Sequence, residues 1–274
     1  GPGSTVTVAL WGGFPAGNGI WIKRNTGSGW GTPAIQVSGT DDAQYPKLVI
    51  DGTGKIHLAW AAILYDPPPA DIWSYRVRYV ASTDGTTWSA PISINSTNIS
   101  WTWWGLPVVG LTKDSKNNIY VGWGEPNAVS GVDIKYSKWN GSTWGSPIPL
   151  RNVLEVDSPY LFQDVWDNQH FVWTEKNQST VQWEIWYSIL AGYWATIGSG
   201  GGTLTVNPNN VTLATLTVPS GALGSNVNIF AAVGPIPQSA NPNYVTIPRS
   251  YSFGPSGQTF SKNYTTIYTY TTAE

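Results

Sequence analysis

The sequence predicts an all-β protein in which a β-propeller of about four blades, the first one incomplete, is followed by a β-sandwich. Three observations predict it: a repeated Trp-Pro phrase, apolar runs that end in Trp at a regular period, and a change of composition near residue 198. The phrase Gly-x-x-Trp-x-x-Pro occurs at 27–33, 85–91 and 141–147. A short motif that returns in this way indicates one structural unit used several times.

The repeating unit has the length of four short strands. Its second apolar run ends in Trp at positions 11, 60, 123 and 173, so the copies lie 49, 63 and 50 residues apart. The apolar runs alternate with period 2, and Gly, Asp and Asn residues mark the turns between them. About 40–50 residues per four strands is the period of a propeller blade, whose faces are buried only when blades stack on one another.

Composition divides the chain into four parts. Residues 1–4 (Gly-Pro-Gly-Ser) look like a cloning scar. Residues 5–197 carry the blades, the Gly-rich residues 198–202 are expected to be a linker, and residues 203–274 hold Trp-free strands rich in Thr, Val and Tyr. The first blade begins at its second strand, and the fourth keeps Trp194 of the phrase but not the Pro. The ring is therefore expected to close unconventionally or to be an arc of a larger ring.

Charge and composition narrow the function. Only 11% of the residues are charged and the net charge is −2, so no nucleic-acid footprint is present. No apolar run reaches the ~20 residues of a membrane span. Seventeen Trp and 14 Tyr suit β-sheets and surfaces that stack on sugar rings. Six Asn-x-Ser/Thr sequons favour an extracellular or cell-surface setting.

One repeat copy resembles a known propeller motif. The stretch Ser82–Trp88 (Ser-Thr-Asp-Gly-Thr-Thr-Trp) resembles the Asp-box of sialidase-like β-propellers, although it is one residue shorter, and Asn25 and Asn140 stand near the place of its Asp in two other copies. The resemblance covers roughly residues 5–197. It implies the fold and not the activity, because these boxes are structural turns far from the usual active site. The three-Arg ring of a sialidase cannot be assembled from the aligned blades.

The C-terminal part carries a second resemblance. The stretches 215–223 (TLTVPSGAL) and 251–260 (YSFGPSGQTF) resemble the β-sandwich module shared by zonula-occludens proteins, netrin receptors and ankyrins. Some relatives cleave themselves at a His-Phe-Ser site. This part of the chain contains no His, and Tyr-Ser-Phe-Gly at 251–254 does not match, so self-cleavage is not implied.

Four acids recur at equivalent places in the blades. Glu125 and Glu175 each stand two residues after the repeat Trp, and Asp133 and Glu184 each stand just before the next strand. All four are expected near one rim of neighbouring blades, as candidate ligand-binding residues. Two facing carboxylates could act as acid and base in glycoside hydrolysis, with Glu125 and Glu175 as the catalytic candidates. Repetition in successive blades favours the alternative that each acid caps its own loop.

The two His residues share a repeat position that also holds other residue types. His57 and His170 are equivalent to Tyr120 and to Val8, and a position that accepts Val is a packing position. The chain has no Cys and no further His to complete a metal site. No metal and no cofactor are therefore expected.

A Trp cluster lies outside the repeat. Trp101, Trp103 and Trp104 occupy the connection between the second and third blades, and Trp73 lies in an inserted loop after Pro67–Pro69. Loops on a rigid scaffold often carry function, and flat indole rings stack on sugars. These four Trp are predicted to bind ligand, with the alternative that Trp103 or Trp104 plugs the groove between blades.

The sequence thus predicts an extracellular or cell-surface binding module without catalysis, whose ligand is a glycan. Two alternatives stay open. One is a sialidase-like glycoside hydrolase that uses Glu125 or Glu175. The other is a structural or assembly domain that associates with itself through open sheet edges.

Overall fold

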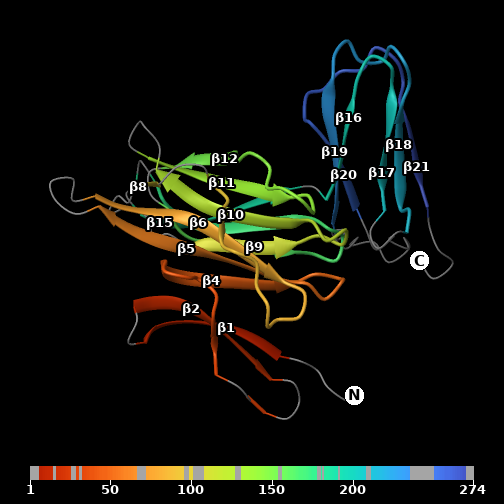
Figure 1. The fold of residues 1–274 in the computed structure, drawn as a ribbon. Helices are drawn as coiled ribbons and strands as arrows, with labels where there is room; N and C mark the ends of the chain where they lie inside the picture. The colour runs from red at the N-terminus through yellow and green to blue at the C-terminus, as the bar shows by residue number, and fades with distance from the viewer. Residues whose placement is uncertain are drawn as a thin grey trace, which may run out of the picture. The chain divides into compact units, whose positions relative to one another are not determined.

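The computed structural model describes most of the 274-residue chain. The described residues are 6–14, 17–25, 29–30, 33–66, 72–95, 99–100, 108–126, 131–153, 156–177, 180, 182–190, 192–207, 211–234 and 250–269. Within them every regular element is a β-strand, and the strands form six antiparallel sheets (Figure 1). The chain divides into two compact units, Gly1–Phe162 with Phe171–Ser188 and Gln163–His170 with Ile189–Glu274.

The first unit contains four sheets in chain order, here named blades one to four. Blade one has β1 (Val6–Phe14), β2 (Gly17–Asn25) and β3 (Ile35–Gln36). Blade two has β4 (Asp42–Ile50), β5 (Ile56–Asp66), β6 (Ile72–Ser82) and β7 (Ile92–Ser93), with β8 (Ile99–Ser100) also paired to β6. Blade three has β9 (Val109–Lys113), β10 (Ile119–Pro126), β11 (Val132–Trp139) and β12 (Ile148–Val153). Blade four has β13 (Val156–Gln163), β14 (Gln169–Lys176) and β15 (Trp183–Leu190).

Because side chains alternate in direction along its strands, blade two has two faces, and both are buried. On β5, Leu58 and Trp60 pack with residues of blade one, whereas Ala59 and Ala61 pack with β9 and β10 of blade three. The repeat Trp of blade three, Trp123, lies in that second core and so also points to the preceding blade. We call the face with the repeat Trp the backward face of a blade and the opposite one its forward face.

Blades three and four pack closely because glycines stand where they meet. A Cβ added at Gly122 of β10 would come within 2.9 Å of Leu161 on β13, and one at Gly124 within 2.5 Å of Val156. The ring of Phe171 lies 5.7 Å from that of Tyr136 on β11. The backward face of blade four therefore covers the forward face of blade three. These stacked blades agree with the predicted propeller class.

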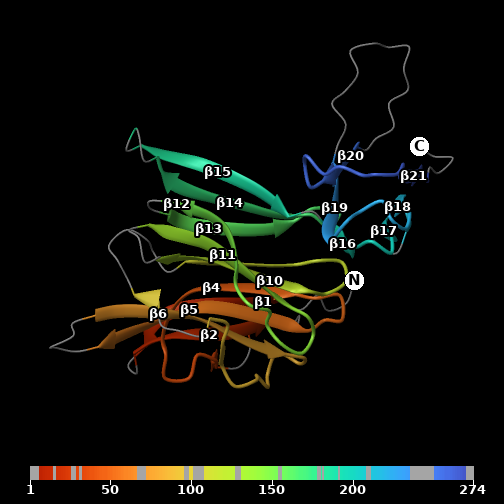
Figure 2. The same ribbon diagram turned by 90° about the horizontal axis from the view of Figure 1, so that it is seen from above.

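The second unit is a β-sandwich. One sheet consists of β16 (Tyr193–Ile197), β19 (Val227–Gly234) and β20 (Ser250–Gly254). The other consists of β17 (Gly202–Val206), β18 (Ala214–Val218) and β21 (Thr265–Tyr268) (Figure 2). Both sheets contribute to one core, which includes Ile197, Leu204, Leu216, Ile229 and Val233. The all-β class and the propeller-plus-sandwich architecture predicted from the sequence are confirmed.

The strand β16 lies in the sandwich, whereas the sequence placed it at the end of the fourth blade. It pairs with β19, and its alternating residues Tyr193 and Ile197 are buried in the sandwich core. The expected linker at 198–202 is a tight turn, in which a bridge joins Gly198 to Gly201 and Gly201 has a φ of 78°. The difference arises because Trp194 has the spacing of the repeat phrase, while its strand neighbours supply the apolar side chains that the sandwich buries.

No helix that is long and apolar enough to cross a bilayer occurs among the described residues.

Candidate functional site

The predicted Trp cluster falls largely outside the described residues. Trp101, Trp103 and Trp104 lie outside them. Trp73 lies on β6, where the strand register places its backbone opposite Tyr65, and its side chain is not described. Ligand binding by these four Trp stays a prediction.

The acids of blade three gather around one lysine. The strand register sets Glu125 opposite Asp133 and Trp123 opposite Lys135. Glu125 accepts hydrogen bonds from Trp123 Nε1 at 3.0 Å and from Lys135 Nζ at 3.0 Å. Lys135 Nζ also lies 3.7 Å from the carboxylate of Asp133. The structure therefore brings two of the four predicted acids together, with a cation between them.

The equivalent acid of blade four is buried. Glu175 accepts a hydrogen bond from Trp173 Nε1 at 2.8 Å and two from Arg151, at 3.0 Å from Nε and 2.9 Å from Nη2. The Arg151 guanidinium stands 3.7 Å above the ring of Trp186. The fourth predicted acid, Glu184, accepts a hydrogen bond from Asn177 Nδ2 at 2.8 Å.

These contacts decide what the acids can do chemically. Glu125 and Glu175 each use one oxygen for the indole N–H of the repeat Trp and oppose a cation, so their charge is already compensated. A general base needs lone pairs within reach of a substrate proton. The arrangement joins the strands and satisfies a buried indole, which is a structural task. No group of three His, Cys, Asp or Glu suited to a metal occurs in the described part of the chain.

The side chain at the repeat position of the two His residues contacts the carboxylate of the preceding turn. Asp51, Asp114 and Asp164 each cap a turn through backbone N–H groups two and four residues later. Their second oxygen lies 3.2 Å from His57 Nε2, 3.1 Å from the Tyr120 hydroxyl and 2.9 Å from His170 Nε2. The two His residues therefore act as turn partners, and a tyrosine fills the same role in blade three.

His57 is the more deeply buried of the two. Its Nδ1 lies 2.6 Å from the Tyr79 hydroxyl, on the side of the ring away from Asp51. Burial lowers the pKa of His57, although the Asp51 carboxylate acts in the opposite direction. Burial, and after it the charge of Asp51, raises the pKa of Tyr79. His57 is thus a neutral ring at neutral pH, held between an acceptor and a hydroxyl.

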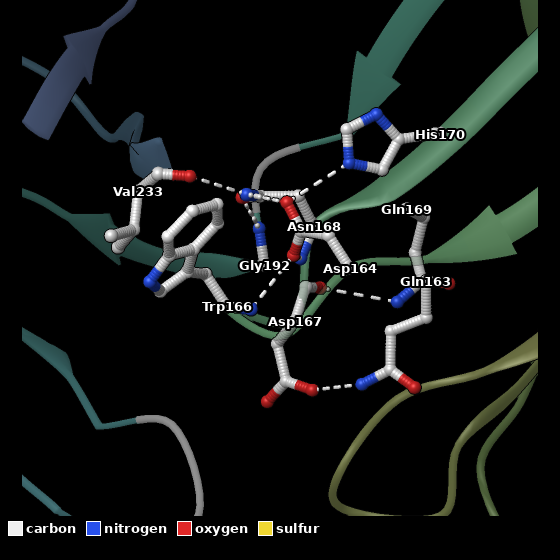
Figure 3. Close-up of polar contacts among 9 residues, drawn as sticks. All are labelled: Gln163, Asp164, Trp166, Asp167, Asn168, Gln169, His170, Gly192 and Val233. Carbon is white, nitrogen blue, oxygen red and sulfur yellow. Dashed lines mark hydrogen bonds and ion pairs between the residues drawn. The ribbon is translucent and has the colours of Figure 1, made fainter. Parts of the chain in front are cut away.

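The third turn of this kind belongs to the second unit (Figure 3). Asn168, which is fully buried, donates from Nδ2 to Asp164 at 2.7 Å and to the Val233 carbonyl at 2.6 Å. Its Oδ1 accepts from the Gly192 N–H at 3.3 Å. Asp167 has a φ of 68°, the left-handed position that Gly54 and Asn117 hold in the other two turns.

Asp84 and Asn140 form equivalent turns in blades two and three. Asp84 Oδ1 accepts the backbone N–H groups of Thr86 and Thr87, both at 2.7 Å, and these bonds, that of Thr87 first, lower the pKa of Asp84. Asn140 Oδ1 accepts the N–H groups of Ser142 at 3.0 Å and Thr143 at 2.9 Å. An amide oxygen thus replaces a carboxylate, which shows that the turn needs an acceptor and not a charge.

The outer face of the β16–β19–β20 sheet carries two exposed aromatic side chains in register, here called the platform. Trp194 is 61% exposed and Phe230 is 39% exposed, and they stand directly opposite each other on β16 and β19. Phe230 is in turn opposite Gly254 on β20, where an added Cβ would collide with the Phe230 ring. The absence of a side chain at Gly254 therefore gives the Phe230 ring its place on the sheet.

Small polar side chains surround the platform. Thr196 and Asn228 form the next cross-strand pair on the same face, and Thr196 Oγ1 donates to Asn228 Oδ1 at 2.7 Å. The exposed Ser252 of β20 is opposite Ala232 of β19. The face thus offers flat rings beside hydroxyl and amide groups. Sequence reasoning missed it, since the alternation of β16 and β19 shows two faces but not their register.

Comparisons with known proteins give no family. No family model and no curated protein matches the chain. Among solved structures, an ulvan lyase of polysaccharide lyase family 25 is 10% identical, over 84% of this chain and 69% of that one, with a TM-score of 0.46. An endo-arabinase from Bacteroides thetaiotaomicron VPI-5482 is 11% identical, over 98% and 94%, with a TM-score of 0.39. A fucose lectin from Kordia zhangzhouensis is 16% identical, over 53% and 97%, with a TM-score of 0.30. Similarity this low carries no argument about what this chain does.

Proposed function

We propose that the protein is a non-catalytic carbohydrate-binding module, and that the platform on the sandwich binds a neutral oligosaccharide. The observation that carries this proposal is the cross-strand pair of Trp194 and Phe230, two aromatic rings left open to solvent on the outer face of a sheet. An extracellular or cell-surface setting belongs to the same proposal, since glycans are abundant there.

A sugar ring has two parts that a protein can bind, its C–H face and the hydroxyls at its edge. A pyranose presents a C–H face that packs on an indole or phenyl ring, and this contact removes apolar area from water at about 25 cal/mol per Å². Its hydroxyls need hydrogen-bond partners at the edge of the ring. Thr196, Asn228 and Ser252 supply hydroxyl and amide groups on the same face. Neighbouring strands lie ~4.8 Å apart, so aromatic residues on adjacent strands stand about one sugar ring apart.

A neutral ligand is favoured by the residues around the rings. The described outward-facing residues of β16, β19 and β20 near the rings are Thr, Asn, Ala, Ser and Gly, which carry no charge. The acids that a hydrolase would need are engaged elsewhere: Glu125 is paired with Lys135 and Glu175 with Arg151. Binding without catalysis is therefore the function that the described side chains favour over glycoside hydrolysis.

A glycan array followed by calorimetry tests the proposal. We expect neutral oligosaccharides to bind, with cellohexaose and xylohexaose as the first soluble probes. Trp194→Ala should weaken binding at least tenfold, which is ~1.4 kcal/mol. Trp30→Ala removes a Trp of the first unit that is 47% exposed and should leave the affinity unchanged.

A blank array would end the carbohydrate proposal. Binding that survives Trp194→Ala unchanged would instead show that the sugar is bound away from the platform, for example by the predicted Trp cluster at 101–104.

A further inference from the structure

The forward face of blade four is apolar and exposed. Burial alternates along β14 and β15. On β14 the side chains toward blade three, such as Phe171 and Trp173, are buried and the others are half-buried, whereas on β15 the side chains toward blade three are half-buried and the others are exposed. The large side chains of this forward face that are more than 40% exposed are Tyr160 and Phe162 on β13 and Trp183, Ile185 and Tyr187 on β15. Figure 2 shows the three strands of this sheet side by side.

In the two preceding blades the same positions are covered. Strand register sets Arg78 opposite Trp60 and Lys135 opposite Trp123. The Ile-Trp-Tyr run at 185–187 aligns in sequence with 77–79 and 134–136, so Val77, Ile134 and Ile185 hold one equivalent position in the three blades. Val77 and Ile134 are 0% exposed. Ile185 is 79% exposed.

The next position on the same face repeats this contrast. It is tyrosine in all three blades, at 79, 136 and 187. Tyr79 is 3% exposed and Tyr136 is partly buried, whereas Tyr187 is 53% exposed. Blade four thus has apolar and aromatic side chains at the positions that a following blade buries in blades two and three. In blade four no described residue buries them to a similar degree.

We propose that this face is an interface at which a second copy of the chain packs its own blade four, so that two forward faces meet about a twofold axis. Sheets pack face to face at ~10 Å through interdigitated apolar side chains, as blades two and three already do within one chain. The dimer continues that mode of packing at the place where the stack of blades is open.

The exposed area is close to the minimum that a specific dimer needs. A large aromatic side chain offers about 150–250 Å². Five large side chains exposed to about half their area therefore present roughly 500–600 Å², at the upper end of the largest apolar patch that a typical monomer exposes. Two such faces bury about 1,000–1,200 Å² from these side chains alone, at the lower end of specific interfaces.

The distribution of charge favours pairing of the face with itself. Its centre holds Ile185 and Tyr187, with Val172 and Thr174 of β14 on the same side, while Lys176 stands at the end of the strand. The Lys47 ammonium lies 5.9 Å from the centre of the Tyr160 ring. A mainly apolar patch with cations toward its rim needs no oppositely charged partner surface, and twofold dimers are the commonest closed oligomers.

Sedimentation and light scattering over a range of concentrations test this interface. We expect the full chain to be a dimer at micromolar concentration. Ile185→Glu should weaken the dimer at least ~100-fold, because a carboxylate would be buried without a partner. Ile267→Glu makes the same change at an exposed position of the sandwich and should leave the dimer intact.

A cross-linking variant covers the case in which Ile185→Glu does not fold. The chain has no Cys, so Ile185→Cys introduces a single thiol. Under mild oxidation it should form an inter-chain disulfide, and Ile267→Cys should not.

Three results would overturn the proposal. A wild-type chain that stays monomeric with an Ile185→Cys thiol open to alkylation would show that the face has no partner copy. The same monomer with a shielded thiol would show that the chain covers the face itself. Trimers, larger rings or open chains would show a head-to-tail contact in place of two like faces.

Discussion

The outer face of the β16–β19–β20 sheet and the forward face of blade four both expose aromatic side chains, and they differ in what surrounds the rings. On the sandwich, Trp194 and Phe230 stand beside the hydroxyl of Thr196. On blade four, Tyr187 stands beside Ile185 on a face whose exposed side chains are mainly aliphatic and aromatic. An aromatic ring alone therefore does not identify a partner. Rings among hydroxyl and amide groups match a sugar, whereas rings among aliphatic groups match another apolar sheet.

The two faces also differ in how they can be recognised. The blade-four face is conspicuous because equivalent residues in blades two and three are buried, so the repeat itself supplies the comparison. The platform has no such counterpart in the repeat. Its assignment rests on the register that sets Trp194 opposite Phe230 and Phe230 opposite Gly254.

The largest expected effect is a difference in the free energy of unfolding between the same substitution made at two equivalent positions, one at a time. Ile134→Ala should lower the free energy of unfolding by about 3–4 kcal/mol, because it leaves a cavity at a fully buried site. Ile185→Ala should cost less than about 0.5 kcal/mol in the dilute monomer, because that side chain is already in water. Urea unfolding at submicromolar concentration measures both. Equal losses would mean that Ile185 is buried within a single chain.

The next prediction is that Glu175 and Glu125 contribute to the stability of the fold and not to glycan binding. Glu175→Gln should lower the free energy of unfolding by about 2 kcal/mol, since it removes a charge that Arg151 opposes; the partial exposure of Arg151 keeps the loss below that of a fully buried pair. Glu125→Gln, where both partners are more open, should cost less than about 1 kcal/mol. Thermal and urea unfolding follow the loss. Weaker glycan binding in either variant would contradict the separation of acids and platform.

A smaller effect is expected from pH. Folding lowers the pKa of His57 below its unfolded value near 6.5. Neutral His57 therefore contributes its full share of the free energy of unfolding above pH 6.5, and this share is lost as the pH falls below 6.5. Asp51 stays ionised in this range: burial acts to raise its pKa, but hydrogen bonds from Thr53 and His57 outweigh burial and lower it. Between pH 7.5 and about 5.5 the wild type should lose up to about 1 kcal/mol more than His57→Gln. Parallel pH profiles would show that His57 does not titrate on unfolding.

The smallest expected effect is a change in glycan affinity when the Phe230 ring is displaced. Gly254→Ala places a methyl group where the Phe230 ring lies, so the ring must move and glycan affinity should fall about threefold, ~0.7 kcal/mol. In Gly234→Ala, at the other end of the same strand pair, the new methyl group meets only Ser250 Oγ at 3.5 Å, and affinity should not change. Calorimetry compares the two. Equal affinities would remove Phe230 from the proposed site.

Much of the fold could be predicted because the repeat reports it directly. The period of the repeat Trp and the alternation of the strands gave the blades, and the change of composition gave the sandwich. The boundary was missed at β16, where Trp194 copies the spacing of the phrase but Tyr193 and Ile197 belong to the sandwich core. The turn at 164–170 contains no Gly to mark it, because Asp167 occupies the left-handed position and Asp164 is the acceptor.

The candidate sites could be predicted only in part. Sequence spacing placed all four acids near one rim of neighbouring blades, and the structure sets Glu125 opposite Asp133 because both lie on one hairpin. It could not show that Arg151, from β12 of another blade, pairs with Glu175, because this contact depends on how blades stack. The platform was missed for the same reason: the pairing of β16 with β19 joins strands that are separated in sequence by β17 and β18.

The central claim, that the platform is the glycan site, is tested most directly by following the indole N–H signals of the Trp residues during an NMR titration with the best-bound oligosaccharide. The Trp194 signal is assigned by its loss in Trp194→Ala, and those of Trp101, Trp103 and Trp104 by the corresponding variants. We predict that the Trp194 signal moves saturably and that the other three stay in place. Movement of the loop signals with a stationary Trp194 would contradict the proposed site.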